Sequence, residues 1–137
     1  MLRLIATYLA TAVAFAAVDY VWLSQIGPSV YHPTLDEVLR PIDDPVDFPA
    51  AIAFYLAYIL GILALAIWPN RDRPLLQTTV TGGLLGAMCY ATYDLTNQAT
   101  LKVWATHITL ADVAWGTFLT AVGATVGGFV FRRIKAA

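Results

Sequence analysis

Three aspartates lie inside or beside long apolar stretches of this sequence. Asp19 falls within the first apolar run, Asp94 lies near the end of the third, and Asp112 lies at the start of the last. A carboxylate at the centre of a membrane helix costs about 2.5–3.5 kcal/mol on insertion scales, so it is tolerated where it faces the protein interior and finds partners. In such a setting a carboxylate can hold a proton, bind a cation or fix the polar end of a ligand.

Aromatic and amide side chains accompany these acids. The first and last runs share the pattern Asp-x-x-Trp, which begins at Asp19 and at Asp112, and the third run ends in the polar string of residues 93–97. A few polar groups in an apolar pocket are the usual form of a ligand site. The residues that we expect to line such a pocket are Asp19, Asp94, Asn97, Asp112, Trp22, Tyr90, Tyr93 and Trp115.

Structural roles compete with the pocket hypothesis. With Thr109 as a helix cap, Asp112 would be the third helical residue, where a carboxylate bonds back to the cap amide. Asp94 lies near the outgoing end of its helix, where the helix dipole disfavours an anion, so it needs a partner. The candidates are Asn97, Tyr90, Thr96, Lys102 or a buried water. Asp19 has no capping role and lies deepest, so we most expect this residue to be functional or protonated. The structural alternative is an interhelical bond to the region of Asn97 or Thr96.

A metal site is a weaker alternative. The side chains that would supply nitrogen and oxygen ligands are Asp19, Asp94, His107 and Asp112. No spacing typical of a metal site, such as two histidines one helical turn apart, supports them, so we expect no metal and no cofactor. The single cysteine, Cys89, lies in an apolar run and is predicted to be an inert thiol. No Ser–His or Cys–His pairing has positional support, so we lean away from an enzyme.

The composition indicates the membrane class. Apolar residues make up 59% of the chain and charged residues only 12%, whereas soluble domains carry about 25% charged residues. The net charge of −1 and the lack of a basic stripe with interleaved aromatics argue against nucleic-acid binding. At 137 residues, the chain fits a single domain.

Four apolar runs approach or exceed the roughly 20 residues that a membrane helix needs. They cover about residues 4–26, 50–68, 75–97 and 109–131. A cleaved signal peptide is the competing interpretation of the first run. We favour a retained span, because the apolar character continues beyond the small residues at 14–17 through Leu23. The expected fold is an all-α integral membrane bundle of four transmembrane helices.

A polar loop is predicted between the first two spans. Gly27 and Pro28 are expected to end the first helix, and the segment 27–49 is rich in prolines and acids. Thr34 and Glu37 fit a capping box for a short amphipathic helix, which Pro41 would stop.

The basic residues predict the orientation. If the amino terminus is cytoplasmic, six of the eight Lys and Arg residues are cytoplasmic as well, which is the positive-inside pattern. These six are Arg3, Arg71, Arg73, Arg132, Arg133 and Lys135. Both termini are then cytoplasmic and the loop 27–49 is periplasmic. The three aspartates fall in the outer half of the bilayer, where we expect them to converge.

Four segments carry a resemblance to a known family. They are residues 90–101 with Trp104, residues 112–116, residues 19–23 and residues 54–61. Together they resemble the small bacterial membrane-protein family called domain of unknown function 2177, and the Tyr-Asp-Leu-Thr-Asn string at 93–97 is their most specific part. The resemblance covers nearly the whole chain and implies a four-helix protein of the bacterial inner membrane. It implies no particular reaction.

Three function hypotheses follow. The leading one is a protein that binds a lipid, an apolar small molecule or a proton or cation in an outer-leaflet pocket. The first alternative is a lipid-modifying enzyme, or a subunit of one, in which the same acids transfer protons or support a metal. The second is an interaction subunit or homo-oligomer, because small residues spaced by four let helices approach closely. The residues with this spacing are Gly82, Gly86, Gly123 and Gly127.

Overall fold

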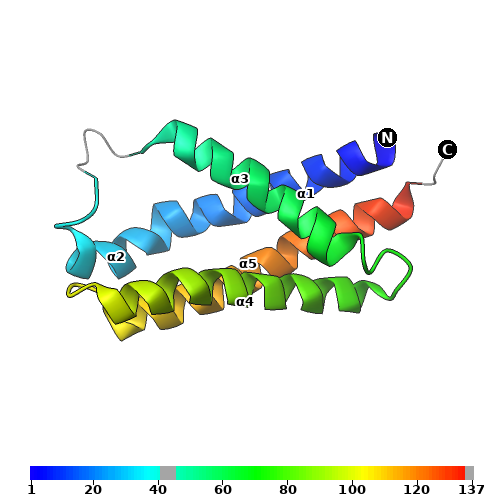
Figure 1. Cartoon of the computed structure of the whole chain (residues 1–137). Helices are drawn as coiled ribbons and strands as arrows, with labels where there is room; N and C mark the ends of the chain where they lie inside the picture. The colour runs from blue at the N-terminus through cyan, green and yellow to red at the C-terminus, as the bar shows by residue number, and fades with distance from the viewer. Residues whose placement is uncertain (41–45, 135–137) are drawn as a thin grey trace.

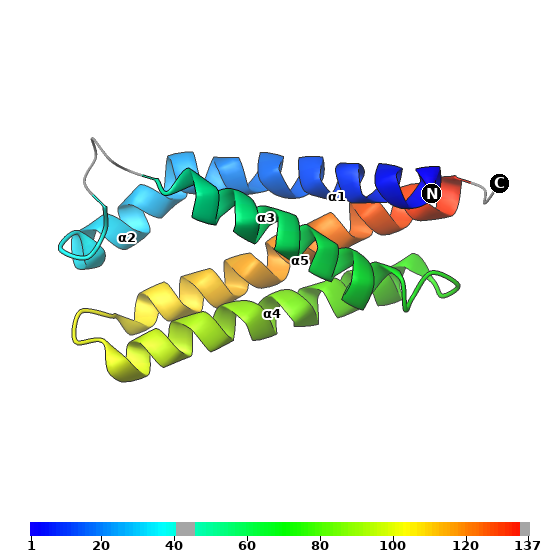
Figure 2. The ribbon, with the colours of Figure 1, turned by 45° about the horizontal axis from the view of Figure 1, so that its top comes forward.

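Helices run the length of the molecule, and α4 and α5 lie side by side over most of it (Figures 1 and 2). The structure is a computed structural model and describes residues 1–40 and 46–134. All regular structure in these residues is helical, which confirms the all-α prediction. The elements in chain order are α1 (Leu2–Val21), η1 (Trp22–Ile26), α2 (Gly27–Leu35), α3 (Phe48–Ile62), η2 (Leu63–Ile67), α4 (Leu75–Thr100) and α5 (Thr106–Arg133).

The first helix is longer than the sequence predicted. α1, η1 and α2 form one continuous helix of 34 residues, so the prediction that Gly27 and Pro28 end the helix is wrong. A proline inside a helix removes one hydrogen bond and clashes with the carbonyl four residues earlier. Here η1 is a single wide π-helical turn, in which the Gly27 N–H donates to the Trp22 carbonyl. This turn lies directly before Pro28, and the chain continues as helix.

The expected capping box is also wrong. Thr34 lies inside α2, which ends at Leu35, and the amides of Val38 and Leu39 bond to the Leu35 carbonyl. The predicted helix stop at Pro41 lies outside the described residues. The segment expected to be a loop therefore begins with helix, which places side chains of α2 against the bundle.

The next two helices agree with the predicted runs. α3 and η2 form a continuous helix of 20 residues, in which Pro49 lies in the first turn and the Asp47 carboxylate accepts from the Ala50 amide at 3.1 Å. The link to α4 is short, so α4 returns toward the end where α3 began (Figure 1).

The last helix begins earlier than predicted. α5 starts at Thr106, with Ala105 as its cap residue, and no side chain caps it. Asp112 is therefore in the second turn, and the predicted capping role of Asp112 with Thr109 is wrong. The burial of the Asp112 carboxylate is instead explained by a hydrogen bond from Tyr31, described below.

Three of the helices are long and apolar enough to cross a membrane: Leu2–Leu35, Phe48–Ile67 and Thr106–Arg133. α4 has the length, with 26 residues, but is not among them. Its side toward α5 is built of glycine and threonine, which lowers its mean hydropathy. Its outer side exposes an apolar stripe with a spacing of four, formed by Leu76, Val80, Leu84 and Met88. A fourth crossing by α4 stays a prediction, which this stripe supports.

Glycines allow the close contact of α4 with α5. A Cβ on Gly86 would lie 2.1 Å from the Gly116 carbonyl oxygen, and one on Gly82 would lie 2.4 Å from the Ala124 side chain. Similarly, a Cβ on Gly127 would lie 2.0 Å from Thr11 Oγ1 of α1. These glycines therefore pack against helices of the same chain. A homo-oligomer through the small-residue faces stays a prediction.

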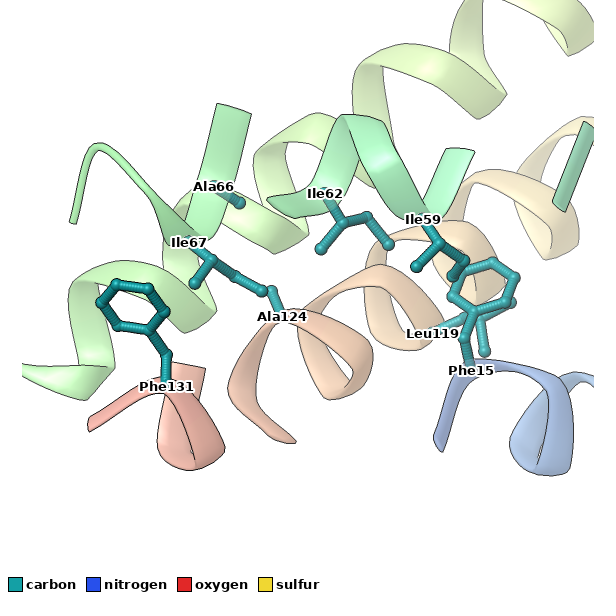
Figure 3. Packing of buried hydrophobic residues seen from close by; sticks show 8 residues of the cluster. All are labelled: Phe15, Ile59, Ile62, Ala66, Ile67, Leu119, Ala124 and Phe131. Atoms are coloured by element: carbon teal, nitrogen blue, oxygen red, sulfur yellow. The ribbon is translucent and has the colours of Figure 1, made fainter. Parts of the chain in front are cut away.

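The apolar core lies where α1, α3, η2 and α5 meet (Figure 3). Its members are Phe15, Ile59, Ile62, Ala66, Ile67, Leu119, Ala124 and Phe131. Many large apolar side chains point outward instead, including Leu9 on α1 and Leu56 on α3, each 56% exposed. Exposed apolar surface on every long helix is typical of a protein surrounded by lipid.

One end of the bundle is basic. The start of α1 and the end of α5 lie together at this end, beside the loop between η2 and α4 (Figure 2). Arg3 Nε donates to the Phe131 carbonyl at 2.7 Å, and Arg132 Nη2 donates to the carbonyls of Asn70 and Arg73 at 2.9 Å. These arginines tie the first helix, the loop and the last helix together. Lys135, which the sequence placed in the same group, lies outside the described residues.

Candidate functional site

Asp19 accepts two hydrogen bonds from aromatic side chains on different helices. The Tyr55 hydroxyl of α3 donates to Asp19 Oδ2 at 2.5 Å, and Trp115 Nε1 of α5 donates to Asp19 Oδ1 at 3.3 Å. Asp19 is only 7% exposed. A buried carboxylate that meets donors on both oxygens is compensated for its loss of water, and here it joins three helices.

Asp112 is bound from α2. The Tyr31 hydroxyl donates to Asp112 Oδ1 at 2.5 Å and accepts from Trp22 Nε1 at 2.9 Å. Gly27 makes room for this arrangement, because a Cβ there would lie 3.1 Å from the Tyr31 ring. The helical continuation beyond Pro28 is what brings Tyr31 to the site.

The two Asp-x-x-Trp patterns meet face to face. Trp22 and Trp115 stack, with ring centroids 4.5 Å apart and an angle of 14° between the rings. α1 and α5 are antiparallel, so each tryptophan serves the aspartate of the other helix. Trp115 binds Asp19 directly and Trp22 reaches Asp112 through Tyr31. We call the six residues Asp19, Trp22, Tyr31, Tyr55, Asp112 and Trp115 the aspartate–tryptophan network.

Asp94 is fully buried, and its carboxyl group lies within hydrogen-bonding reach of the Asp112 carboxyl group but accepts no hydrogen bond from an N–H or hydroxyl group of the described residues. Its carboxyl group interacts electrostatically with that of Asp112. One turn earlier on α4, Tyr90 packs against Gly116, which lies one turn after Asp112 on the antiparallel α5. The expected donor Asn97 does not reach Asp94, which corrects that prediction.

A polar cluster closes the contact of α4 with α5 beyond Asp94. Trp104 Nε1 donates to Thr109 Oγ1 at 3.1 Å, and this hydroxyl donates to Gln98 Oε1 at 2.7 Å. Thr109 therefore serves this cluster and not a helix cap. On the other side of the carboxyl pair lies the ring of Tyr90, so Asp94 and Asp112 share an enclosed position between the helices.

A groove between α3 and α4 leads to this position. A cavity of about 360 Å³ is lined by Phe54, Tyr58, Cys89, Tyr90, Tyr93 and Asp112. A second cavity of about 270 Å³ shares Phe54, Tyr58 and Cys89 with the first. It continues along Ala57, Gly61, Leu65 and Leu85. We call the two together the α3–α4 groove. It has aromatic and apolar walls, its outer part includes the exposed Phe54 and Tyr93, and its polar end is Asp112.

The structure brings together most of the predicted site residues. Asp19, Trp22, Asp112 and Trp115 form the network, Tyr90 and Tyr93 line the groove, and Asp94 lies behind Asp112. Tyr90 lines the groove together with Asp112 and packs against Gly116, so it lies where the groove meets the network. Asn97 takes no part in these contacts. In the described part of the chain, no group of three or more His, Cys, Asp or Glu side chains is placed to hold a metal ion.

Several residues of the site that were not predicted have only weak signals in the sequence. The two tyrosines at 55 and 58 were visible as polar groups in a charge-free run, and buried tyrosine hydroxyls usually have partners. Tyr58 indeed bonds to Thr120 Oγ1 at 2.9 Å. Nothing in the sequence indicated that Tyr31 belongs to the site, because the segment 27–49 was predicted to be a loop.

The fold and the site together define a class: a helical membrane protein with an internal network of carboxyl and aromatic side chains. Within that class, the chain belongs to the family DUF2177, described as "Predicted membrane protein", whose model matches residues 4–129. No curated protein and no solved structure matches the chain.

Proposed function

We propose that this protein binds a lipid or another apolar molecule in the α3–α4 groove, with the polar end of the ligand at Asp112. The observation that carries this proposal is the composition of the groove. Phe54, Tyr58 and Tyr93 supply aromatic surface, and Asp112 supplies one strong acceptor at the end. A mostly apolar cleft with a single well-placed polar group suits a ligand that has an apolar body and a polar head.

The position of the groove supports binding from the outer leaflet of a bacterial inner membrane. If the basic end faces the cytoplasm, Asp19 lies 16 residues beyond Arg3, from residue 3 to residue 19. This corresponds to about 24 Å along α1, within a hydrocarbon core about 30 Å thick. The ligand would then enter sideways from lipid, between α3 and α4.

Filling the groove tests the proposal. Ala57→Trp places an indole in the groove, whereas Ala53→Trp adds the same group one turn earlier on exposed α3 surface outside it. Mass spectrometry of the purified proteins would identify the apolar molecules that each retains. We expect wild type and Ala53→Trp to retain the same species near one per chain, and Ala57→Trp to lose it. Equal retention by the two variants, or no retained species in wild type, contradicts the proposal.

A second candidate function is proton transfer to or from a lipid substrate, and the paired carboxyl groups of Asp94 and Asp112 favour it. Two adjacent carboxyl groups that share a proton are a known arrangement for acid–base chemistry. The test is the lipid composition of cells that lack the protein, with complementation by wild type or by Asp112→Asn. A lipid change that wild type reverses and Asp112→Asn does not supports this candidate, and an unchanged composition rejects it.

A further inference from the structure

We infer that the ligand of the α3–α4 groove carries an ammonium group, held by the carboxyl pair of Asp112 and Asp94. This inference rests on the groove being the binding site, as proposed above. It narrows the ligand to a cationic amphiphile, either a lipid with an amino head group or a free lipophilic amine.

The first support is that no positively charged side chain balances the carboxyl groups of Asp94 and Asp112. Asp94 is fully buried and receives no hydrogen bond from an N–H or hydroxyl donor in the described part of the chain, and its nearest polar contact is the Asp112 carboxyl group beside it. Two neighbouring carboxyl groups in apolar surroundings require either a proton or a cation. None of the ion pairs among the described residues includes either of them. Two buried carboxylates without a cationic side chain repel each other and have lost their hydration. A bound cation would offset both costs.

The second support is the chemistry of the groove walls. Four aromatic rings line the larger cavity, and none of its lining residues is Lys, Arg or His. A cation within about 6 Å of an aromatic ring is attracted by the negative charge on the face of that ring, more strongly where water is excluded. Aromatic walls that end at a carboxylate favour a cationic group over a neutral one at that end, and they disfavour a head group of net negative charge.

The competing explanation is a shared proton. If Asp94 keeps a proton and donates it toward Asp112, the pair needs no cation and the groove has no preference for a charged ligand. The two explanations predict different selectivity between molecules that have the same apolar chain and different polar ends.

Binding of radiolabelled dodecylammonium to the full-length protein in neutral maltoside micelles distinguishes them. Unlabelled dodecylammonium, dodecanol and dodecanoate serve as competitors of equal chain length. Asp94→Asn removes the second charge, and Asp72→Asn is the matched control, because that side chain is 84% exposed at the basic end. Circular dichroism confirms that each variant is folded, and Asp112→Asn serves as a second variant.

For wild type and Asp72→Asn, we expect dodecylammonium to compete at least tenfold better than dodecanol and dodecanoate. For Asp94→Asn and Asp112→Asn, this preference should be lost. Equal competition by dodecylammonium and dodecanol in wild type overturns the inference but leaves the groove as an apolar binding site. If dodecylammonium does not bind wild type, the inference fails, and the proposed function is then decided separately by the retained apolar molecules of wild type, Ala53→Trp and Ala57→Trp. Competition by phosphatidylethanolamine, but not phosphatidylglycerol, identifies a lipid head group as the source, and a lack of competition by both lipids identifies a free amine.

Discussion

At the residue scale, the three aspartates occupy different environments. Asp19 and Asp112 each receive an aromatic donor, whereas Asp94 receives none among the described residues. A buried polar group with a partner stabilises a fold modestly, and one without a partner costs about 1–3 kcal/mol or more if charged. Asp19 and Asp112 therefore have structural explanations as well as functional ones. Asp94 has no such structural compensation, which makes it the most informative residue to change.

Removal of the Tyr31 hydroxyl should destabilise the protein. Tyr31→Phe leaves Asp112 Oδ1 and Trp22 Nε1 without their shared partner. We expect a loss of about 1 kcal/mol in the free energy of unfolding, measured by thermal unfolding in detergent. Tyr20→Phe is the control, since the Tyr20 side chain is 71% exposed. Equal unfolding temperatures for the two variants would show that the bridge contributes nothing.

Neutralising the aspartates should have opposite effects on stability. Asp94→Asn removes a buried charge that has no donor, so we expect the free energy of unfolding to stay within about 0.5 kcal/mol or to rise. Asp19→Asn replaces an oxygen that accepts from Tyr55 or Trp115 with an amide nitrogen, and we expect a loss of about 1–3 kcal/mol. Denaturant unfolding of both variants measures the difference. A larger loss for Asp94→Asn than for Asp19→Asn contradicts this interpretation.

At the scale of elements, the antiparallel contact of α4 with α5 sets the register of the site. Gly86 opposes Gly116 and Thr120, and the same register places Asp94 opposite Asp112. Small residues let helix backbones approach in lipid, where association depends on packing and hydrogen bonds instead of the hydrophobic effect. The close approach that buries the carboxyl pair is therefore a consequence of the glycines.

Adding one methyl group at this contact should separate the helices. Gly86→Ala places a Cβ 2.1 Å from a backbone oxygen, which only a shift of α5 can relieve. We expect a destabilisation of about 1–3 kcal/mol, measured by chemical unfolding. Gly61→Ala on α3 is the control, because nothing lies within 4 Å of the added atom, and alanine favours a helix interior over glycine by about 1 kcal/mol. If the two variants are equally stable, the contact is not tight.

At the scale of the whole molecule, charge and polarity are unevenly distributed. Arg3, Arg73 and Arg132 gather where α1 starts and α5 ends, and the carboxyl and aromatic network lies toward the other end. Positive charge retained on the cytoplasmic side orients membrane helices. A cytoplasmic basic end, with the groove near the periplasmic face, stays a prediction from this charge distribution.

Single cysteines report both the orientation and the crossing of α4. In a Cys89→Ser background, we expect Lys102→Cys to react with a membrane-impermeant maleimide in cells whose outer membrane alone is permeabilised. Asp72→Cys should react only after the inner membrane is opened. The two positions flank α4, so labelling of both from the same side would show that α4 does not cross. Reversed labelling would show the opposite orientation.

The sequence by itself determined that the chain is a helical membrane protein, and it located the central residues of most helices. Long apolar runs in a chain with few charged residues indicate membrane spans. Such spans are helical, because backbone polar groups in lipid must form hydrogen bonds within their own segment. Three of the runs match helices apolar enough to cross. The Asp-x-x-Trp patterns and the buried acids were also visible, because each violates the apolar composition around it.

Only the tertiary structure decided how those residues meet. A π-helical turn at Trp22–Ile26 carries the first helix past Pro28 and delivers Tyr31 to Asp112, whereas local sequence rules predicted a loop there. The register of α4 on α5 placed Asp94 beside an acid, and Asn97, one turn later on α4, does not bond to it. Local patterns report the preferences of one segment, but the partner of a buried side chain depends on which helices pack together and how closely. In this protein, glycines far apart in the sequence set that closeness, and so they decide which carboxyl groups share one site.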